Sequence, residues 1–572
     1  MVGRSVRRVA VVLVLVAGAA GVSGVVAPGA GAGAPPTVVE VTTAADVTDG
    51  ADGLMSLREA FATAQSNGLT TEIRLAADTV YELTDCAAPF DGGLSESSPE
   101  ALILTGRGAT VRQTCPGTNV ISIYDGDIGI RDLTITGGDQ DGSCCSGGLQ
   151  VDGGSGVVLL ERLQIVGNTS ANSSGGSGLY ADGADIVLRD SVIRGNEGIG
   201  AGGGARLTGP STIERTAIIG NRAVGASGGG LVLDAGGTVT SSTIARNEGA
   251  NIGAVLAFGP VTLLHSTLAD NLPATGQVVM GSLTLGGTVI AGPPGEQCSV
   301  SSTTSLGQNY STSDCGLGVD DVKDAPDPDL RPLFDNGGGT LTMYPRATSP
   351  LLDAVASGDA ELPANDQRRL ARPGGTAGDV GAVEVQPCGA RFIDLAAGQA
   401  FCWEIGWLAD AGVTTGNVDG SFGVTAPVTR QSMAAFLYRL AGSPAFEAPA
   451  VATFSDVAVG STFFVPVEWL ASTGITSGVG DGSFGALNPV TRQSMSAFLY
   501  ALAGHPLFVA PETASFPDVP VGSLFFEKVE WLATTGITGG FGDGSFGPVL
   551  PVTRQSMAAF LYRFVDGQIL DV

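Results

Sequence analysis

The stretch that decides the fold is LERLQIVGN, residues 160–168, because altered copies of it follow along the chain. The copies are LRDSVIRGN at 188–196, IERTAIIGN at 213–221, VTSSTIARN at 239–247 and LLHSTLADN at 263–271. Each copy ends on an asparagine, with aliphatic residues three and eight positions before it. The asparagines, 28, 25, 26 and 24 residues apart, are Asn168, Asn196, Asn221, Asn247 and Asn271. The aliphatic pair alone recurs at Ile130 with Ile135 and at Leu285 with Ile290, which makes seven units.

The spacing of the aliphatic pair predicts the path of the chain. Side chains five positions apart in one straight strand point to opposite faces, so a buried pair at that spacing needs a bend between two short strands. Short repeats with Gly-rich turns are typical of a right-handed parallel β-helix, whose coils stack ~4.8 Å apart. Stacking would bury the aliphatic columns and let each asparagine hydrogen-bond to those above and below it. A leucine-rich repeat is disfavoured because it would show a denser leucine pattern.

The last third of the chain contains a second repeat, with a constant period of 62 residues. It is marked by the module aspartates Asp394, Asp456 and Asp518, the module tryptophans Trp407, Trp469 and Trp531, and the module arginines Arg430, Arg492 and Arg554. Each copy predicts a helix, a Gly-rich loop such as residues 481–485, and a second helix after a threonine such as Thr491, whose hydroxyl can cap it. Two short helices cannot bury both apolar stripes alone, so the copies should pack as a pseudo-threefold unit. The predicted fold class is therefore mainly β, with a parallel β-helix followed by three α-helical modules.

Length and composition agree with two kinds of domain. At 572 residues the chain is too long for one hydrophobic core. With 87 glycines, 15% charged and 43% hydrophobic residues, it resembles a glycine-rich β protein more than a disordered chain. The net charge of -28 argues against binding to nucleic acid or anionic lipid. Only two lysines occur, so nearly all positive charge is arginine, whose guanidinium can hold a carboxylate through two parallel hydrogen bonds.

The N-terminus has the pattern of an export signal. Three arginines precede an apolar run over residues 9–20, and small residues with possible cleavage points follow at 27–34. The mature chain is then expected to begin near Pro35, with no membrane span after cleavage. A retained membrane anchor is the alternative, but the run is shorter than the ~20 residues that a span requires.

Eight cysteines in an exported chain favour disulfides over a metal site. The plausible local pairs are Cys86 with Cys115, Cys298 with Cys315, and Cys388 with Cys402, which leaves Cys144 and Cys145 unassigned. A zinc site would recruit histidine or paired CxxC ligands, and the only histidines, His265 and His505, lie far apart in the sequence. We expect neither a metal nor a cofactor.

The three C-terminal copies resemble S-layer homology domains. That family has an aromatic-x-Asp opening, a Gly-x-Phe element in the loop and a Thr-Arg-Ala-Glu helix start, which here reads Thr-Arg-Gln-Ser at 429–432, 491–494 and 553–556. The resemblance covers residues 388–567. It implies non-covalent attachment to a secondary cell-wall polysaccharide, often one that carries pyruvate ketals, with the motif arginine facing the negative charge. Serine in place of the capping-box glutamate, and phenylalanines in place of an early tryptophan, depart from the family pattern.

Two smaller resemblances flank the β-helix. LMSLREA at residues 54–60 resembles the CSLREA motif of surface β-helix proteins, with Met55 in place of cysteine. SPLLD, NDQR and GDVGAVE, at 349–353, 365–368 and 378–384, resemble the choice-of-anchor Q type of surface domain. Neither resemblance brings an established activity.

These signals divide the chain into segments. We expect a signal peptide at 1–34, an N-terminal cap with the CSLREA-like motif at 35–100, the β-helix at 101–335, a choice-of-anchor Q-like segment at 336–387, and S-layer homology-like modules at 388–442, 454–504 and 516–567.

The recurring module residues are the candidate wall-polysaccharide-binding residues. The module arginines come first because a guanidinium suits a ketal carboxylate or a phosphate; alternatively, each pairs with the aspartate of its own module. The module tryptophans could stack on a sugar ring or pack against the neighbouring module, and packing is favoured. The module aspartates are expected to cap the first helix of each module, with a sugar contact as the alternative.

The two repeat systems predict an exported cell-surface protein, held on cell-wall polysaccharide by the modules and displaying the β-helix for adhesion, glycan binding or surface structure. The competing class is a wall-anchored polysaccharide lyase or glycoside hydrolase with its active site on the β-helix. Asp182, Asp185, Asp190 and Asp234 are candidates by residue type alone, since they share no register and have no basic cluster beside them. We therefore assign no catalytic residue. In a third possibility the modules bind protein partners in a surface lattice.

Overall fold

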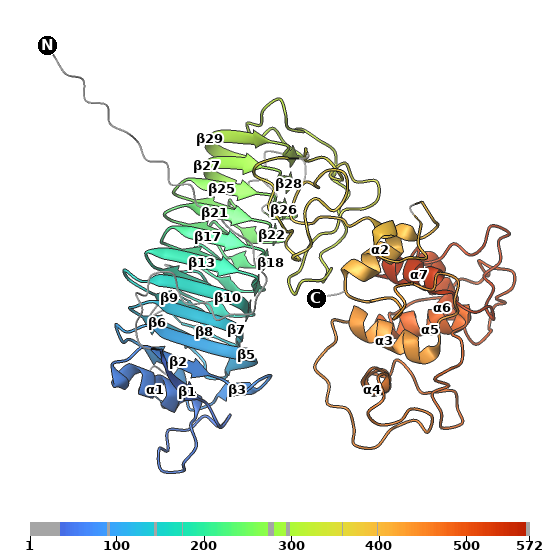
Figure 1. The fold of residues 1–572 in the computed structure, drawn as a ribbon, viewed down its shortest axis with the longest axis horizontal. Helices are drawn as coiled ribbons and strands as arrows, with labels where there is room; N and C mark the ends of the chain where they lie inside the picture. The colour runs from blue at the N-terminus through green and yellow to red at the C-terminus, as the bar shows by residue number, and fades with distance from the viewer. Residues whose placement is uncertain are drawn as a thin grey trace. The chain divides into compact units, whose positions relative to one another are not determined.

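The computed structural model describes residues 35–88, 92–141, 146–173, 175–272, 279–292, 298–356, 358–396 and 398–567 (Figure 1). The expected signal peptide, residues 1–34, and the unassigned Cys144 and Cys145 lie outside the described residues. Within these ranges no helix has both the length and the apolar character needed to cross a membrane.

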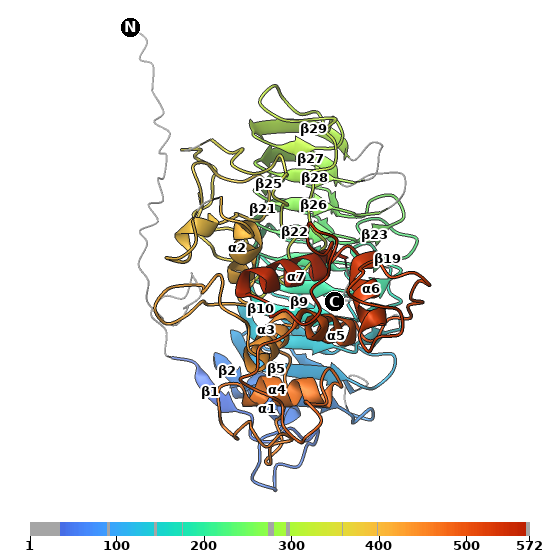
Figure 2. The ribbon, with the colours of Figure 1, turned by 90° about the vertical axis from the view of Figure 1, so that its right-hand side faces the viewer.

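A parallel β-helix occupies the chain from β1 to β30, and its strands stack as successive coils (Figures 1 and 2). The first column of paired strands consists of β1 (Thr37–Glu40), β2 (Thr71–Arg74), β5 (Leu102–Gln113), β7 (Ile128–Thr136), β10 (Val157–Val166), β13 (Asp185–Arg189), β17 (Ser211–Glu214), β21 (Gly237–Thr240), β25 (Val261–Leu264), β27 (Val279–Gly286) and β29 (Cys298–Gly307). The second consists of β3 (Val80–Leu83), the later halves of β5, β7 and β10, and β14 (Val192–Arg194), β18 (Ala217–Ile219), β22 (Thr243–Ala245), β26 (Thr267–Ala269), β28 (Val289–Ala291) and β30 (Tyr310–Ser311).

Two further columns complete the coils. One consists of β4 (Leu94–Glu96), β6 (Ile121–Tyr124), β9 (Leu149–Asp152), β12 (Leu179–Asp182), β16 (Ala205–Leu207), β20 (Leu231–Leu233) and β24 (Val255–Ala257), and continues into the starts of β27 and β29. The other is a row of two-residue strands: β8 (Asp139–Gln140), β11 (Thr169–Ser170), β15 (Glu197–Gly198), β19 (Arg222–Ala223) and β23 (Glu248–Gly249).

The predicted aliphatic pairs are buried in the first two columns. In the first column Leu160 pairs in register with Leu188, and in the second Ile165 pairs with Ile193; all four side chains are fully buried. The expected bend lies between them, at Arg162, whose φ of 50° is in the left-handed region. One such residue per coil turns the strand and keeps both aliphatic side chains inside.

The asparagines form the predicted ladder along the turns. The side-chain nitrogen Nδ2 of each donates to Oδ1 of the next, at 3.0 Å from Asn168 to Asn196 and 2.9 Å from Asn196 to Asn221. The same bond continues to Asn247 and Asn271. From Asn196 onward each Oδ1 also accepts the backbone N–H of the preceding asparagine, so buried polar groups that would otherwise lack partners are satisfied.

A second ladder, made of hydroxyls, was not predicted. Its members stand five positions before an asparagine or, for Thr288, in the matching place before β28: Ser191, Thr216, Ser242, Ser266 and Thr288. Each hydroxyl oxygen accepts the backbone N–H of the coil before it, at 3.0 to 3.5 Å. Both corners flanking the second column are therefore held by side-chain bonds that run along the helix axis.

The N-terminal end of the β-helix is covered by helix α1 (Leu57–Asn67). Ser56 and Glu59 form a capping box at its start. Arg58 forms a buried ion pair with Asp46 and donates to the carbonyl oxygens of Gly92 and Gly93. The CSLREA-like stretch therefore supplies both the cap and the buried ion pair that fasten α1 here.

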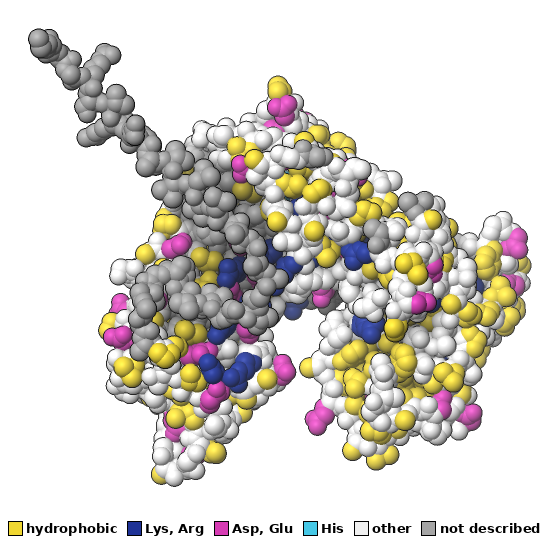
Figure 3. Space-filling model, in the orientation of Figure 1, with side chains coloured by type: hydrophobic (Ala, Val, Ile, Leu, Met, Phe, Trp, Pro, Cys, Tyr) yellow, Lys and Arg dark blue, Asp and Glu magenta, His cyan; other side chains and the backbone are white. Residues whose placement is uncertain are grey.

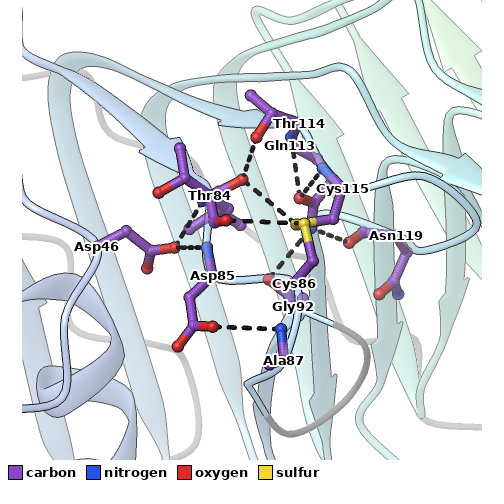
Figure 4. Close-up of a disulfide and its surroundings, with 12 residues drawn as sticks. Asp46, Thr84, Asp85, Cys86, Ala87, Gly92, Gln113, Thr114, Cys115 and Asn119 are labelled. Atoms are coloured by element: carbon purple, nitrogen blue, oxygen red, sulfur yellow. Dashed lines mark hydrogen bonds between the residues drawn. A yellow bond between two sulfur atoms is a disulfide. The ribbon is translucent and has the colours of Figure 1, made fainter.

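The three predicted disulfides are confirmed: Cys86 with Cys115, Cys298 with Cys315, and Cys388 with Cys402. The first joins two neighbouring coils beside α1. Around it, Asp46 accepts the backbone N–H groups of Thr84 and Asp85, and the side chain of Gln113 donates to the carbonyls of Gly92 and Asn119 (Figure 4).

A connecting segment spans residues 326–386, and its described residues form isolated bridges and turns, with no helix or longer strand. It packs apolar side chains, such as Leu351 and Val380, against the outward side of β14, β18, β22 and β26. Gln367 accepts a hydrogen bond from Thr243 at 2.6 Å within that contact. The outward face of the second column is thus buried under chain from outside the β-helix.

Six helices follow η2 (Cys388–Ala390), two for each module. They are α2 (Cys402–Asp410) with α3 (Arg430–Leu440), α4 (Phe464–Ser472) with α5 (Arg492–Leu502), and α6 (Phe526–Thr534) with α7 (Arg554–Gly567). Thr429 and Thr491 cap α3 and α5 by accepting the N–H of the residue three positions on, which confirms the predicted caps despite the missing glutamate. Apolar side chains gather over α3 and α4 on the face drawn in Figure 3.

Candidate functional site

The three modules join in a closed ring. The N–H of Val428 donates to the carbonyl of Val552, Val552 to Val490, and Val490 back to Val428, at 2.8 to 2.9 Å. Helix contacts follow the same order: α3 packs on α4, α5 on α6, and α7 on α2. Because every module bonds to both others, residues at the start of each second helix lie at a boundary between modules.

Each module arginine crosses such a boundary. Nε of Arg430 donates to the carbonyl of Phe484 in the next module at 2.7 Å, and its guanidinium lies 4.8 Å from the centre of that ring. Nε of Arg492 donates to Phe546, and Nε of Arg554 donates to Phe422, which closes the circle from the third module to the first. In the part of the chain that the structure describes, only Nε of each guanidinium has a hydrogen-bond partner. The Nη groups therefore keep donors for a ligand.

The electrostatic surroundings of the three guanidiniums are equivalent. Burial lowers the pKa of Arg430, Arg492 and Arg554, and the aspartate of the following module opposes that shift. The expected alternative, pairing with the aspartate of the arginine's own module, does not occur: the nearby carboxylate of Arg430 is Asp456, one module on. A carboxylate of the following module thus lies near each guanidinium, and among the described residues the two form no direct ion pair.

The module aspartates hold the Gly-rich loops. Asp394 accepts the backbone N–H groups of Phe422, Gly423 and Val424, at 2.6 to 3.2 Å. Burial raises its pKa, but these bonds outweigh burial and hold the pKa below the usual range. The expected capping of the first helix is wrong, because α2 begins after Phe401, α4 after Phe463 and α6 after Phe525. The carboxylate instead reaches a loop 28 residues further along the chain.

The module tryptophans are buried at the junctions between modules. Trp469 meets Tyr438 edge to face at 5.4 Å, Trp531 meets Tyr500 at 5.4 Å, and Trp407 meets Tyr562 at 5.5 Å. Each tyrosine belongs to the preceding module, so these pairs repeat the order of the ring. At the Trp407 junction the connecting segment adds Arg331, whose guanidinium stacks on both rings, and Asn336, which accepts the indole N–H at 2.8 Å.

The candidate carboxylates of the β-helix do not gather into one site. Asp190 forms ion pairs with Arg215 and Arg369, which hold its pKa below the usual range against the effect of burial. Asp234 forms an ion pair with Arg206. Asp182 lies at the end of β12, where Thr208 donates to it, and Asp185 lines a shallow pocket of about 320 Å³ at the start of β13. Asp182, Asp190 and Asp234 therefore each interact with another side chain of the protein.

Phenylalanine 541 belongs to the candidate site and was missed. Its ring lies 4.4 Å from the Arg492 guanidinium. The module-aligned positions hold Asn417 and Val479, so a comparison of the three loops at the 62-residue period would have singled out this residue. The described residues contain no group of three His, Cys, Asp or Glu side chains placed to hold a metal ion.

Comparison with family models gives the class of protein. A right-handed β-helix region matches residues 119–287, and the S-layer homology domain matches 402–434, 453–496 and 515–558. The chain is thus a right-handed parallel β-helix followed by three S-layer homology domains. This combination supports a location at the cell surface or in the S-layer.

One curated relative is a cell surface protein of Thermoanaerobacter kivui, 30% identical over 125 residues. The match covers 21% of this chain and 16% of the relative, so the chain spans about one sixth of that protein's length. Among solved structures, the crystal structure of pectate lyase Pel9A matches with a TM-score of 0.38 and 14% identity, over 61% of this chain and 97% of that chain. A likeness at this level defines neither a shared site nor a shared activity.

Proposed function

We propose that the three S-layer homology domains hold this protein non-covalently on an anionic cell-wall polysaccharide, and that the β-helix is displayed for adhesion, glycan binding or surface structure. Carboxylates such as those of pyruvate ketals are the expected ligand groups. The observation that carries the proposal is the threefold placement of the module arginines. Each has Nε fixed on a neighbouring loop and its Nη groups left with unused donors.

The fixed guanidinium makes the site suited to a carboxylate. A charge-assisted hydrogen bond contributes about 1.5 to 3 kcal/mol, and a guanidinium held in one orientation loses little further entropy when two such bonds form. Three similar sites on one ring also favour a repeating polymer, since the second and third contacts become intramolecular. The module aspartates and tryptophans support binding indirectly, by holding the loops and the distances between modules.

The test is sedimentation of the chain from residue 35 with purified cell-wall polysaccharide from its own source. We expect the R430Q/R492Q/R554Q variant to stay in the supernatant while its far-UV circular dichroism and melting temperature remain close to those of the parent. Glutamine keeps a donor for the loop carbonyl but loses the charge. The matched control is R563Q, which removes an exposed arginine of α7 outside the three sites.

Binding of the triple variant at the parent's level would exclude the arginines as the anchoring groups. A second arm uses polysaccharide whose carboxylates have been reduced to alcohols. If the parent binds reduced and native polymer equally, the negative charge of the polymer is not what the modules recognise.

A further inference from the structure

The three arginine sites share one framework but differ in a single neighbour. Under every module arginine lie two phenylalanine rings of the following module, one from the loop and one from the second helix. For Arg430 they are Phe484 and Phe498, at 4.8 and 5.2 Å, and for Arg492 they are Phe546 and Phe560, at 4.7 and 5.3 Å. These constant rings position the cation and cannot distinguish one site from another.

Among the residues that the structure describes, only Arg492 has a third aromatic ring beside its guanidinium. Phe541 lies 4.4 Å from its guanidinium, closer than either constant ring. Asn417 and Val479 occupy the aligned positions of the first two modules, so neither other site has an aromatic side chain there. Stacking by Phe541 leaves Arg492 only 7% exposed, yet the phenylalanine itself remains 43% exposed. One face of the ring contacts the cation, and much of the rest faces solvent.

The backbone around Phe541 is built to hold the ring there. Its N–H donates to the carbonyl of Ser545 at 2.7 Å, and its carbonyl accepts the N–H of Gly544 at 2.9 Å. A Cβ at Gly547, where φ is +70°, would lie 2.7 Å from Cε2 of Phe541, so a side chain there would push the ring away. Leu550 also flanks Gly547 and is 48% exposed, which extends the apolar surface beside the ring.

We propose that the Arg492 site takes an acidic sugar ring, with its apolar C–H face on Phe541 and its carboxylate on the Nη edge of Arg492, and that it is the strongest of the three sites. This inference rests on the proposed attachment to an anionic polysaccharide and names the part of the ligand that one site reads. A sugar with a ketal or uronic carboxylate offers both an apolar face and a charge. Inorganic phosphate offers charge alone and cannot use the aromatic platform.

The experiment isolates this site in the chain from residue 35. In an R430Q/R554Q background, which retains Arg492, binding to purified cell-wall polysaccharide is measured by titration calorimetry with and without F541V. Valine is the residue of the second module, so the substitution removes the ring and keeps a side chain that the same loop accepts. We expect F541V to weaken binding by about three- to tenfold, the range for an aromatic contact.

Two further variants make the outcome decisive. With Val479→Phe in an R492Q/R554Q background, the Arg430 site should gain affinity by a similar factor. In an R492Q background, F541V should change nothing, since the ring acts together with that arginine. Unchanged affinity on F541V in the Arg492-only background overturns the proposal. Increased affinity overturns it as well, because the Phe541 ring would then block access of the polysaccharide to Arg492.

The same measurements distinguish failure of this inference from failure of the proposed function. If the triple arginine variant still binds, the attachment model itself is wrong. If the triple arginine variant no longer binds the polysaccharide but F541V in the Arg492-only background retains full affinity, the arginines anchor the chain and Phe541 has no part in recognition. Inorganic phosphate as competitor should displace polysaccharide more readily from the Arg430-only protein than from the Arg492-only protein; equal displacement would contradict the role of the ring.

Discussion

Replacing Asn221 by alanine tests whether the asparagine ladder holds the β-helix together. Its side chain makes four buried hydrogen bonds. Nδ2 donates to the carbonyl of Ile193 and to Oδ1 of Asn247, both at 2.9 Å, and Oδ1 accepts the backbone N–H and Nδ2 of Asn196, at 3.0 and 2.9 Å. Alanine leaves two buried donors of Asn196 without an acceptor. At about 1–3 kcal/mol for each, the expected loss in the free energy of unfolding is about 4 kcal/mol.

Alanine substitutions at other asparagines give reference values for the loss expected at Asn221. At Asn168, the first asparagine of the ladder, the one described donor to Oδ1 is the backbone N–H of Gly138, so alanine there removes the acceptor of one described donor and should cost about half as much. Asn251 is an exposed control that forms a single 3.4 Å bond to Ser227, and alanine there should change stability by less than about 0.5 kcal/mol.

Two probes separate the domains in urea unfolding. All four tryptophans lie in the modules, so tryptophan fluorescence follows the ring, while far-UV circular dichroism near the β minimum follows mainly the β-helix. In the Asn221 variant only the urea midpoint followed by far-UV circular dichroism should shift, and the midpoint followed by tryptophan fluorescence should stay unchanged. A shift of less than about 1 kcal/mol, or one equal to that of the Asn251 variant, would refute the view that the ladder is a main source of stability.

Two other predictions concern buried polar groups. Burial and the nearby Arg372 lower the pKa of His265 to about 3 in the folded protein. In the unfolded chain the pKa is near 6.5, so the unfolded state takes up the proton first as the pH falls. The free energy of unfolding should therefore decrease between pH 6.5 and 3, by up to about 1.4 kcal/mol per pH unit. Urea midpoints at pH 7 and 4 should therefore differ less in His265→Asn than in the parent, and an equal difference would contradict this. Asp410 is buried among Tyr344, Arg368 and Arg391, so Asp410→Ser should cost about 3–5 kcal/mol by calorimetry, whereas Ser472→Ala at the aligned position should be nearly neutral; equal melting temperatures would count against that network.

The sequence was sufficient wherever a feature repeats and acts locally. Aliphatic residues at the same two positions of every coil can only be buried together, and the capping role of Thr491 depends on a residue three positions away. The disulfides were within reach for the same reason, since each joins cysteines fewer than 30 residues apart. The hydroxyl ladder was also accessible, because Ser191 and its counterparts recur five positions before an asparagine.

Contacts between repeats could not be predicted in the same way. The three modules are so alike that the sequence does not say whether Arg430 lies on its own loop or on that of the next module. The same ambiguity made helix capping the natural expectation for Asp394, although the carboxylate binds a loop far along the chain. The contact between the connecting segment and the first module could not be predicted either. One sign of it was present in the sequence: the first module has Asp410 where the other two have Ser472 and Thr534.

The backbone hydrogen bonds among Val428, Val490 and Val552, which close the ring of modules, determine when the ring can form as the chain folds. Its last link joins the first copy to the third, so no subset of modules can assemble the three arginine crossings. A chain that folds while it emerges from a translocation channel would complete the coils of its β-helix first. Its three modules could close their ring only after Val552 has emerged. If the modules attach the protein as proposed above, attachment comes at the end of that process, because the three arginine sites are complete only when all three modules are present.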